Sequence, residues 1–143
     1  MELSWELTED PTRFDLEAID GGLTGFNLEQ GGIDEVRRIA VIARDGSDIT
    51  VGGLLARTWG KCCEVQVLWV RDDLRHGGIG GKLMRLAEKE ARRRGCTLAY
   101  LDTFSFQAPD FYRCLGYEEF QTISGFPRGI TKHFFRKSLA GAD

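Results

Sequence analysis

The sequence lacks both a long apolar run and an excess of positive charge. No stretch reaches the ~18 apolar residues that a membrane-spanning helix needs, so we expect no membrane partner. The segment from Met1 to Glu6 is acidic and has no apolar core of the kind found in secretory signals, which predicts a cytoplasmic protein. Lysine and arginine number 19 against 22 acidic residues, a net charge of −3. Nucleic-acid partners require a basic face, so we expect none.

Cysteine is scarce and is not arranged for metal binding. The four cysteines stand at positions 62, 63, 96 and 114, without the C-x-x-C spacing of zinc sites and redox motifs. We therefore expect reduced, partly buried thiols and no metal cofactor. The residues that are abundant, 42% hydrophobic and 29% charged over 143 positions, are typical of one globular domain spanning residues 1–143.

Turn residues and short apolar runs predict a mainly antiparallel sheet. Asp10-Pro11 indicates the start of a short helix that ends at Ile19, and two Gly-Gly pairs within residues 21–32 indicate a broken helix or a loop after it. Tight turns join the first three strands, as in a meander. The expected strands are residues 38–44, 49–58, 62–70, 98–104, 117–123 and 132–137.

Two helices are expected between these strands. Apolar residues at helical spacing over residues 79–91 predict an amphipathic helix that Gly95 ends, with Glu88 and Glu90 on its outer face. Residues 109–115 predict a short second helix. The strand after the long helix should lie parallel to the strand before it, through a right-handed crossover. This element order predicts an α+β fold with a mixed, mostly antiparallel sheet and one parallel strand pair.

A glycine-rich loop joins the strand 62–70 to the long helix. Its glycines let the backbone approach a ligand closely, and the unpaired N–H groups of a helix start attract an anion. Arg75 adds positive charge, and a pyrophosphate group is the ligand that suits such a loop. The residues expected to bind it are Arg75, His76, Gly77, Gly78, Ile79, Gly80, Gly81 and Lys82.

Two other phosphate-binding motifs do not fit this loop. A P-loop requires glycine where the sequence has His76 and a hydroxyl residue where it has Leu83. The G-x-G-x-x-G motif of dinucleotide-binding proteins begins at Gly78 but also meets Leu83 in place of its third glycine. A nucleotide-binding domain of another class stays open as an alternative, and it predicts tighter binding of ATP or NAD than of coenzyme A.

Two sequence blocks carry a resemblance to a known family. The first is Arg75-His76-Gly77-Gly78-Ile79-Gly80, and the second is Ala108-Pro109-Asp110-Phe111-Tyr112-Arg113-Cys114-Leu115-Gly116-Tyr117. They resemble the Gln/Arg-x-x-Gly-x-Gly/Ala and A-x-x-[LF]-Y-x-x-x-G-[FY] segments of the GNAT superfamily of acyl-CoA-dependent N-acetyltransferases. The resemblance covers roughly residues 36–138. It implies a three-layer fold with helices on both faces of the sheet, and transfer of an acetyl group from acetyl-CoA to a primary amine by direct attack in a ternary complex.

The resemblance also assigns roles to residues. The loop of residues 75–82 would bind the pyrophosphate of coenzyme A. Main-chain groups of Leu68, Trp69 and Val70 would pair with the pantetheine arm as an added strand would. Phe111 would lie in the cofactor site, beside a catalytic Tyr112 that protonates the leaving thiolate, a nearly balanced transfer at ordinary pKa values. Ser105 stands where the family commonly has asparagine, and its hydroxyl would contact coenzyme A instead.

The second catalytic candidate is a base that accepts the amine proton. Glu64 lies eleven residues before Arg75, where several members of the superfamily carry a catalytic glutamate. We expect it to share a strand face with Gln66 and Leu68, where an apolar environment would raise its pKa. Asp102 on the neighbouring strand is the rival base, and a chain of water molecules is the third alternative.

The acceptor is not legible in the sequence beyond a small-molecule or peptide amine. A homodimer is compatible with the exposed edges of such a sheet. Because Ser105 departs from the family pattern, a non-catalytic acyl-CoA-binding regulatory module of the same fold is the alternative function.

Overall fold

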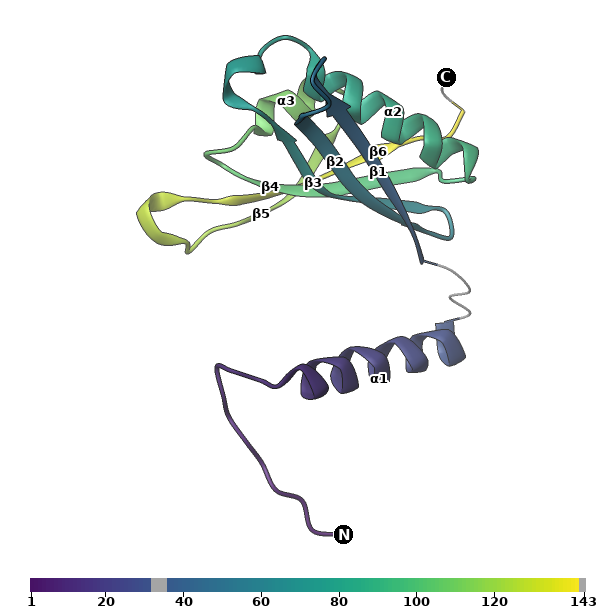
Figure 1. Cartoon of the computed structure of the whole chain (residues 1–143), viewed down its shortest axis with the longest axis vertical. Helices are drawn as coiled ribbons and strands as arrows, with labels where there is room; N and C mark the ends of the chain where they lie inside the picture. The colour runs from purple at the N-terminus through teal and green to yellow at the C-terminus, as the bar shows by residue number, and fades with distance from the viewer. Residues whose placement is uncertain (32–35, 142–143) are drawn as a thin grey trace. The chain divides into compact units, whose positions relative to one another are not determined.

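The computed structural model describes residues 1–31 and 36–141, which fall into two compact units, Met1–Asp34 and Glu35–Asp143 (Figure 1). Each unit is described by itself, and the expectation of a single domain stays a prediction. Within the described ranges, no helix is both long enough and apolar enough to cross a membrane. Gly32, at the end of the glycine-rich segment, lies outside the described residues.

The first unit contains one helix, α1 (Arg13–Gly31), which is longer than the sequence suggested. It begins at a cap that the sequence analysis missed: the Asp15 N–H donates to Thr12 Oγ1 (3.1 Å), and this hydroxyl donates to Asp15 Oδ2 (2.7 Å). The expected break near Gly21 and Gly22 is wrong. Glycine costs a helix about 1 kcal/mol at each position, which weakens the helix but leaves helical backbone angles accessible.

The second unit is built on a six-stranded sheet in the order β1-β2-β3-β4-β6-β5. All neighbouring strands are antiparallel except β3 and β4, so the expected mixed sheet with one parallel pair is confirmed. The strands are β1 (Val36–Arg44), β2 (Thr50–Trp59), β3 (Cys62–Val70), β4 (Leu98–Phe104), β5 (Glu118–Ile123) and β6 (Lys132–Ser138).

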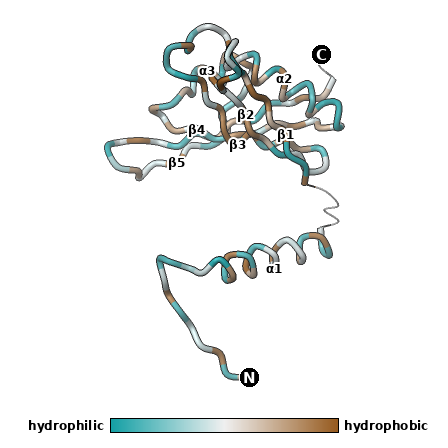
Figure 2. Tube along the Cα trace, in the orientation of Figure 1, coloured by the Kyte–Doolittle hydropathy of each residue, from teal (hydrophilic) through white to brown (hydrophobic). Residues whose placement is uncertain are grey.

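Two helices, α2 (Ile79–Arg93) and α3 (Pro109–Cys114), lie on the same face of this sheet (Figure 1). Apolar residues are concentrated along the strands (Figure 2), and the buried apolar residues of α2 belong to the same core cluster as theirs. The helical layer expected on the other face would have to come from α1, so that part of the three-layer prediction stays a prediction.

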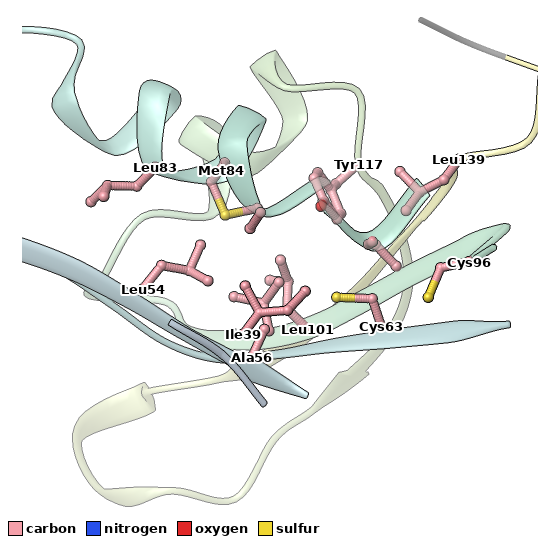
Figure 3. Packing of buried hydrophobic residues seen from close by; sticks show 14 of the residues in the cluster. Ile39, Leu54, Ala56, Cys63, Leu83, Met84, Cys96, Leu101, Tyr117 and Leu139 are labelled. Atoms are coloured by element: carbon pink, nitrogen blue, oxygen red, sulfur yellow. The ribbon is translucent and has the colours of Figure 1, made fainter. Parts of the chain in front are cut away.

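The core lies between α2 and the sheet (Figure 3). Leu83 and Met84 of α2 pack with Leu54 of β2, Leu101 of β4 and Phe135 of β6, and each of these side chains is at most 3% exposed. Burying an aliphatic or aromatic side chain of this size contributes roughly 1.5–3 kcal/mol. The cluster therefore joins strands from both sides of the parallel pair beneath one helix.

Glu88 belongs to this buried layer, and the expectation that it lies on the outer face of the helix is wrong. It is 5% exposed, and its carboxylate accepts hydrogen bonds from the Tyr117 hydroxyl (2.9 Å) and from Lys137 Nζ (2.8 Å). It follows Met84 by four positions, which places both side chains on the helix face that meets the sheet. Glu90, by contrast, forms the expected ion pair with Arg94 (2.7 Å).

Because two tyrosines are buried, we expect the folded protein to lose stability at alkaline pH. Burial, followed by the Asp102 carboxylate, raises the pKa of Tyr112 to about 12, and burial followed by Glu88 raises the pKa of Tyr117. Because the unfolded chain ionises near pH 10, this stabilisation is complete below about pH 10 and is lost as the pH rises through the folded-state values. We expect the free energy of unfolding in urea to fall between pH 10 and 12, with about 2 kcal/mol of the loss due to Tyr112.

The matched control is Tyr112→Phe, which keeps the ring and removes the ionisable hydroxyl. Its free energy of unfolding should depend less on pH over the same range than that of the wild type. Identical pH dependence in the two proteins would show that Tyr112 ionises normally.

Candidate active site

The sheet opens between its two central strands. The parallel ladder pairs Cys62 with Leu98, Cys63 with Ala99 and Glu64 with Tyr100, and it ends there although β3 continues to Val70 and β4 to Phe104. The carboxyl ends of both strands therefore lie on either side of an opening. In sheets containing parallel strands, such strand ends are the usual place for a ligand.

A bulge in β3 changes which side chains face this opening. Ala56 of β2 pairs with Val65 and Leu55 pairs with Val67, so Gln66 is an extra residue without a partner in the register. After the bulge, Leu68 and Val70 pack against the helix-side core, whereas Glu64 lies on the opposite face beside Arg57. The expectation that Glu64 and Leu68 share a face is therefore wrong, because one inserted residue reverses the alternation.

The glycine-rich loop presents backbone amides at the start of α2. The first helical hydrogen bond runs from the Lys82 N–H to the Gly78 carbonyl (3.1 Å), so the amides of Ile79, Gly80 and Gly81 precede the helical ladder. His76 and Gly78 have positive φ values of 65° and 85°, and successive amides in such a conformation form an anion-binding concavity. A Cβ atom built on Gly78 would meet nothing within 4 Å, so the loop is open on that side.

Arg75 is turned back onto its own loop. Its Nε donates to the Val70 carbonyl (3.0 Å), and its Nη2 pairs with Asp72 (2.8 Å). The guanidinium thus holds the end of β3 against the loop and keeps a positive charge next to the amides. It also occupies the Val70 carbonyl, one of the main-chain groups expected to pair with the pantetheine arm, whereas His76 and Lys82 are exposed beside the loop.

The second sequence block lies against this loop. A Cβ atom on Gly80 would come within 3.2 Å of the Phe111 ring, so α3 packs on the first turn of α2. Phe111 in turn packs edge-on against Tyr112, with 5.1 Å between the ring centroids. The two motifs are therefore adjacent in space, as a shared cofactor site requires.

Tyr112 is buried in the helix-side core, 8% exposed, between Phe111, Tyr117 and Phe135. Burial raises its pKa to about 12, so its phenol is a weaker acid than an exposed tyrosine and remains a hydrogen donor at neutral pH. Proton transfer to a thiolate with an ordinary pKa is then less balanced than expected. A thiolate in the same buried environment would itself have a raised pKa, which restores part of the match.

Both candidate bases lie on the face of the sheet opposite α2, and both are ion-paired. Glu64 accepts from Arg57 Nε (2.7 Å), and Asp102 pairs with Lys132 (3.5 Å). The apolar environment expected around Glu64 is therefore not present. Tyr100 stands opposite Glu64 at the end of the ladder, where burial and the Glu64 carboxylate raise its pKa.

Several residues of this face were not predicted from the sequence as site residues. Phe126 of the loop after β5 packs edge-on against Phe104 (5.3 Å between centroids), and the Lys132 ammonium lies 5.5 Å from the centre of the Phe104 ring. Tyr100 could have been found from strand alternation, because it shares a face with Asp102. Arg57 and Phe126 reach the site only through pairing with distant segments, for which one sequence carries no signal.

Ser105 follows β4 and is already engaged within the protein. Its hydroxyl accepts from the Thr131 N–H (3.0 Å), and its own N–H donates to the Thr131 carbonyl (2.8 Å). The hydroxyl keeps one hydrogen to donate, so a contact with a cofactor remains compatible with these bonds. Trp69 has a half-exposed side chain, and its neighbours Leu68 and Val70 face the core.

A mixed sheet that opens beside a glycine-rich helix start, with a buried tyrosine next to it, is the arrangement expected of an acyl-CoA-dependent transferase. Comparison with known proteins agrees. Residues 35–119, more than half of the 143-residue chain, match the family model described as an acetyltransferase (GNAT) domain. The chain belongs to the GNAT acetyltransferase family, so the resemblance and the enzyme class expected from the sequence are confirmed.

Individual relatives carry similar names. The chain is 33% identical to acetyltransferase Atu2258 of Agrobacterium fabrum, over 79% of this chain and 82% of that protein. It is 38% identical to blasticidin-S acetyltransferase of Streptomyces morookaense, over 62% of this chain and 65% of the relative, just under two thirds of its length. A crystal structure named as an acetyltransferase of Agrobacterium tumefaciens superposes with a TM-score of 0.90 and 29% identity, covering 95% of this chain and 99% of that one.

Gly80 provides a test of the cofactor site. Gly80→Ala adds a methyl group 3.2 Å from the Phe111 ring, so the ring or the first turn of α2 must shift. We expect coenzyme A, measured by calorimetry, to bind about tenfold more weakly, which corresponds to about 1.4 kcal/mol. Gly46→Ala, where the added carbon meets nothing within 4 Å, is the control and should bind as the wild type does. If Gly80→Ala bound coenzyme A as tightly as the wild type, the first turn of α2 would not be part of the cofactor site.

Proposed function

We propose that the protein transfers the acetyl group of acetyl-CoA to a primary amine, by direct attack in a ternary complex. The observation that carries this proposal is that the helix-start amides and Tyr112 lie on adjoining elements at one opening of the sheet. Phe111 joins the two by packing on Gly80. A diphosphate on the amides would leave a pantetheine arm free to follow β3 into the opening.

The residues fit such a donor in three respects. Amides that precede a helical ladder bind phosphate oxygens, and Arg75 adds charge beside them. The edge of β3 that β4 leaves after Glu64 has main-chain groups that an extended arm can pair with, at Leu68 and Trp69. Phe111 and Tyr112 supply an apolar wall near the expected thioester.

In the proposed reaction, the amine lone pair attacks the thioester carbonyl carbon, the new C–N bond forms and the C–S bond breaks. The sulfur leaves as a thiolate that receives a proton from the Tyr112 phenol, and the phenol is then reprotonated from solvent. The amine gives up its proton to a base on the opposite face of the sheet. We assign this role to Glu64, with Asp102 or a water chain as the alternatives.

An acyl-enzyme on either of the two buried cysteines is disfavoured. For Cys63 and Cys96 this follows from burial, which raises the pKa of Cys63 to about 12 and also raises that of Cys96, so both remain thiols, which are poor nucleophiles. The relative named for blasticidin S supports a small-molecule amine as the acceptor over a peptide. A cytoplasmic location and a single domain over residues 1–143 complete the proposal.

The function is tested by incubating the purified protein with acetyl-CoA and a panel of amines, with thiol release and product mass as readouts. Release that depends on one amine, with a product heavier by one acetyl group, is the expected result. Binding of coenzyme A without any release across the panel would favour the non-catalytic module. Tighter binding of ATP or NAD than of coenzyme A would favour the other nucleotide-binding class.

Tyr112→Phe tests the acid. The variant keeps the ring contacts with Phe111 and Phe135 and removes only the proton donor. We expect kcat to fall about a hundredfold, while the Kd for acetyl-CoA changes by less than about twofold. Equal losses in kcat and in affinity would mean that Tyr112 binds the cofactor and does not act as an acid.

Glu64→Gln tests the base against its rival. An amide cannot accept the amine proton, so we expect kcat at pH 7 to fall about a hundredfold and to recover partly at higher pH, where the free amine is neutral. Asp102→Asn is the matched comparison and should retain most of the activity. If Asp102→Asn lost much more kcat than Glu64→Gln, the base would be Asp102. Small losses of kcat in both variants would favour the water chain.

A further inference from the structure

A histidine outside the proposed reaction has both ring nitrogens engaged. His133 of β6 contacts Glu119 Oε1 of β5 through Nδ1, and its Nε2 lies 2.8 Å from Thr131 Oγ1. Its side chain is 17% exposed and that of Glu119 is 29% exposed. The hydrogen bond from His133, followed by those from Arg113 and Thr122, lowers the pKa of Glu119. An ionised carboxylate only accepts, so Nδ1 carries the hydrogen, and Nε2 of the neutral ring accepts from the Thr131 hydroxyl.

Both ends of this chain of contacts reach the segment that carries Tyr112. At one end, Thr131 and Ser105 exchange two hydrogen bonds, so the start of the loop of residues 105–108 is tied to the residue before β6. At the other end, Arg113 of α3 donates to Glu119 Oε2 (3.3 Å). The loop before α3 and the helix itself are thus linked to the same imidazole.

The helix needs such support, because little within it fixes its direction. It has six residues, less than two turns, and a helix of this length has almost no stability of its own. Its N-cap, Ala108, has no side-chain hydrogen bond to offer the first turn. Contacts outside the helix therefore determine where the Tyr112 phenol points.

We propose that His133 is a positioning residue for acetyl transfer, which holds the 105–108 loop and α3 through Thr131 and Glu119 so that Tyr112 faces the opening of the sheet. The inference rests on the proposed function for its kinetic consequence, but its structural consequence can be measured without any activity. A small displacement of an acid from its reacting atom lowers the rate far more than it lowers binding.

The contact between Thr131 Oγ1 and His133 Nε2 can be removed by two independent substitutions. Thr131→Val removes the hydroxyl while keeping the shape, and His133→Asn keeps a donor for Glu119 but is too short to reach Thr131. His133→Gln places an amide oxygen near the position of Nε2, where it can accept from Thr131 again. Thr122→Val is the matched control, since Thr122 also donates to Glu119 (3.2 Å) but lies in β5 and, among the described residues, shares no hydrogen bond with residues 105–108.

The first readout is amide hydrogen exchange over residues 105–115, measured by mass spectrometry on the full chain. In Thr131→Val and His133→Asn, the amide hydrogens of this segment should exchange faster than in the wild type. His133→Gln should be closer to the wild type, and Thr122→Val should match it. Unchanged exchange in both cut variants would overturn the inference, whether or not the protein acetylates an amine.

The second readout is the split between kcat and KM, using an amine that the panel identifies. The two cut variants should lose about tenfold to a hundredfold in kcat with KM for the amine changed by less than about twofold, and His133→Gln should recover most of the loss. Faster exchange with an unchanged kcat would overturn the link to Tyr112. A wild type that releases no thiol with any amine would contradict the proposed function and leave the exchange result to decide the positioning.

Discussion

The short parallel ladder between β3 and β4 is the constraint on which the site depends. Three residue pairs join the strands, and beyond Glu64 and Tyr100 each strand follows its own half of the sheet. Three pairs hold two halves weakly, so the junction needs support from elsewhere. The core beneath α2 provides it, because it joins strands of both halves, and the contact of Glu88 with Lys137 and Tyr117 ties α2 to the half that contains β6.

These contacts stabilise the end of the β3–β4 junction that is away from the proposed ligand site. The Glu88 cluster lies toward the closed end of the junction, with Lys137 of β6 opposite Ala99 of β4. The open end is left to the glycine-rich loop and α3, which meet where Phe111 packs near Gly80. A sheet that is fixed at one end and open at the other can accept an extended molecule between its strands without losing its core.

The sequence predicted the strands and the parallel pair, but it missed features that depend on contacts between distant segments. Strand bounds such as 62–70 and 98–104 were recovered because turns and apolar runs are encoded in neighbouring residues. The bulge at Gln66 was missed because it exists only as a mismatch with β2, and the place of β6 between β4 and β5 depends on pairing across the chain. Glu88 was misplaced because a charged residue is expected outside unless its partners are known, and Lys137 lies 49 residues away.

The same bulge decides which face each part of β3 presents. Before it, Glu64 lies with Asp102 on the face opposite α2, where their side chains are 27% and 49% exposed. After it, β3 turns Leu68 toward the helices and the buried core that contains Tyr112. An acid with a raised pKa suits the buried face, because burial keeps it protonated. A base suits the open face, where an ion pair with Arg57 can hold a carboxylate in place. Without the bulge, regular alternation would place Leu68 on the face of Glu64, and the end of β3 would turn Leu68 and Val70 away from the helices.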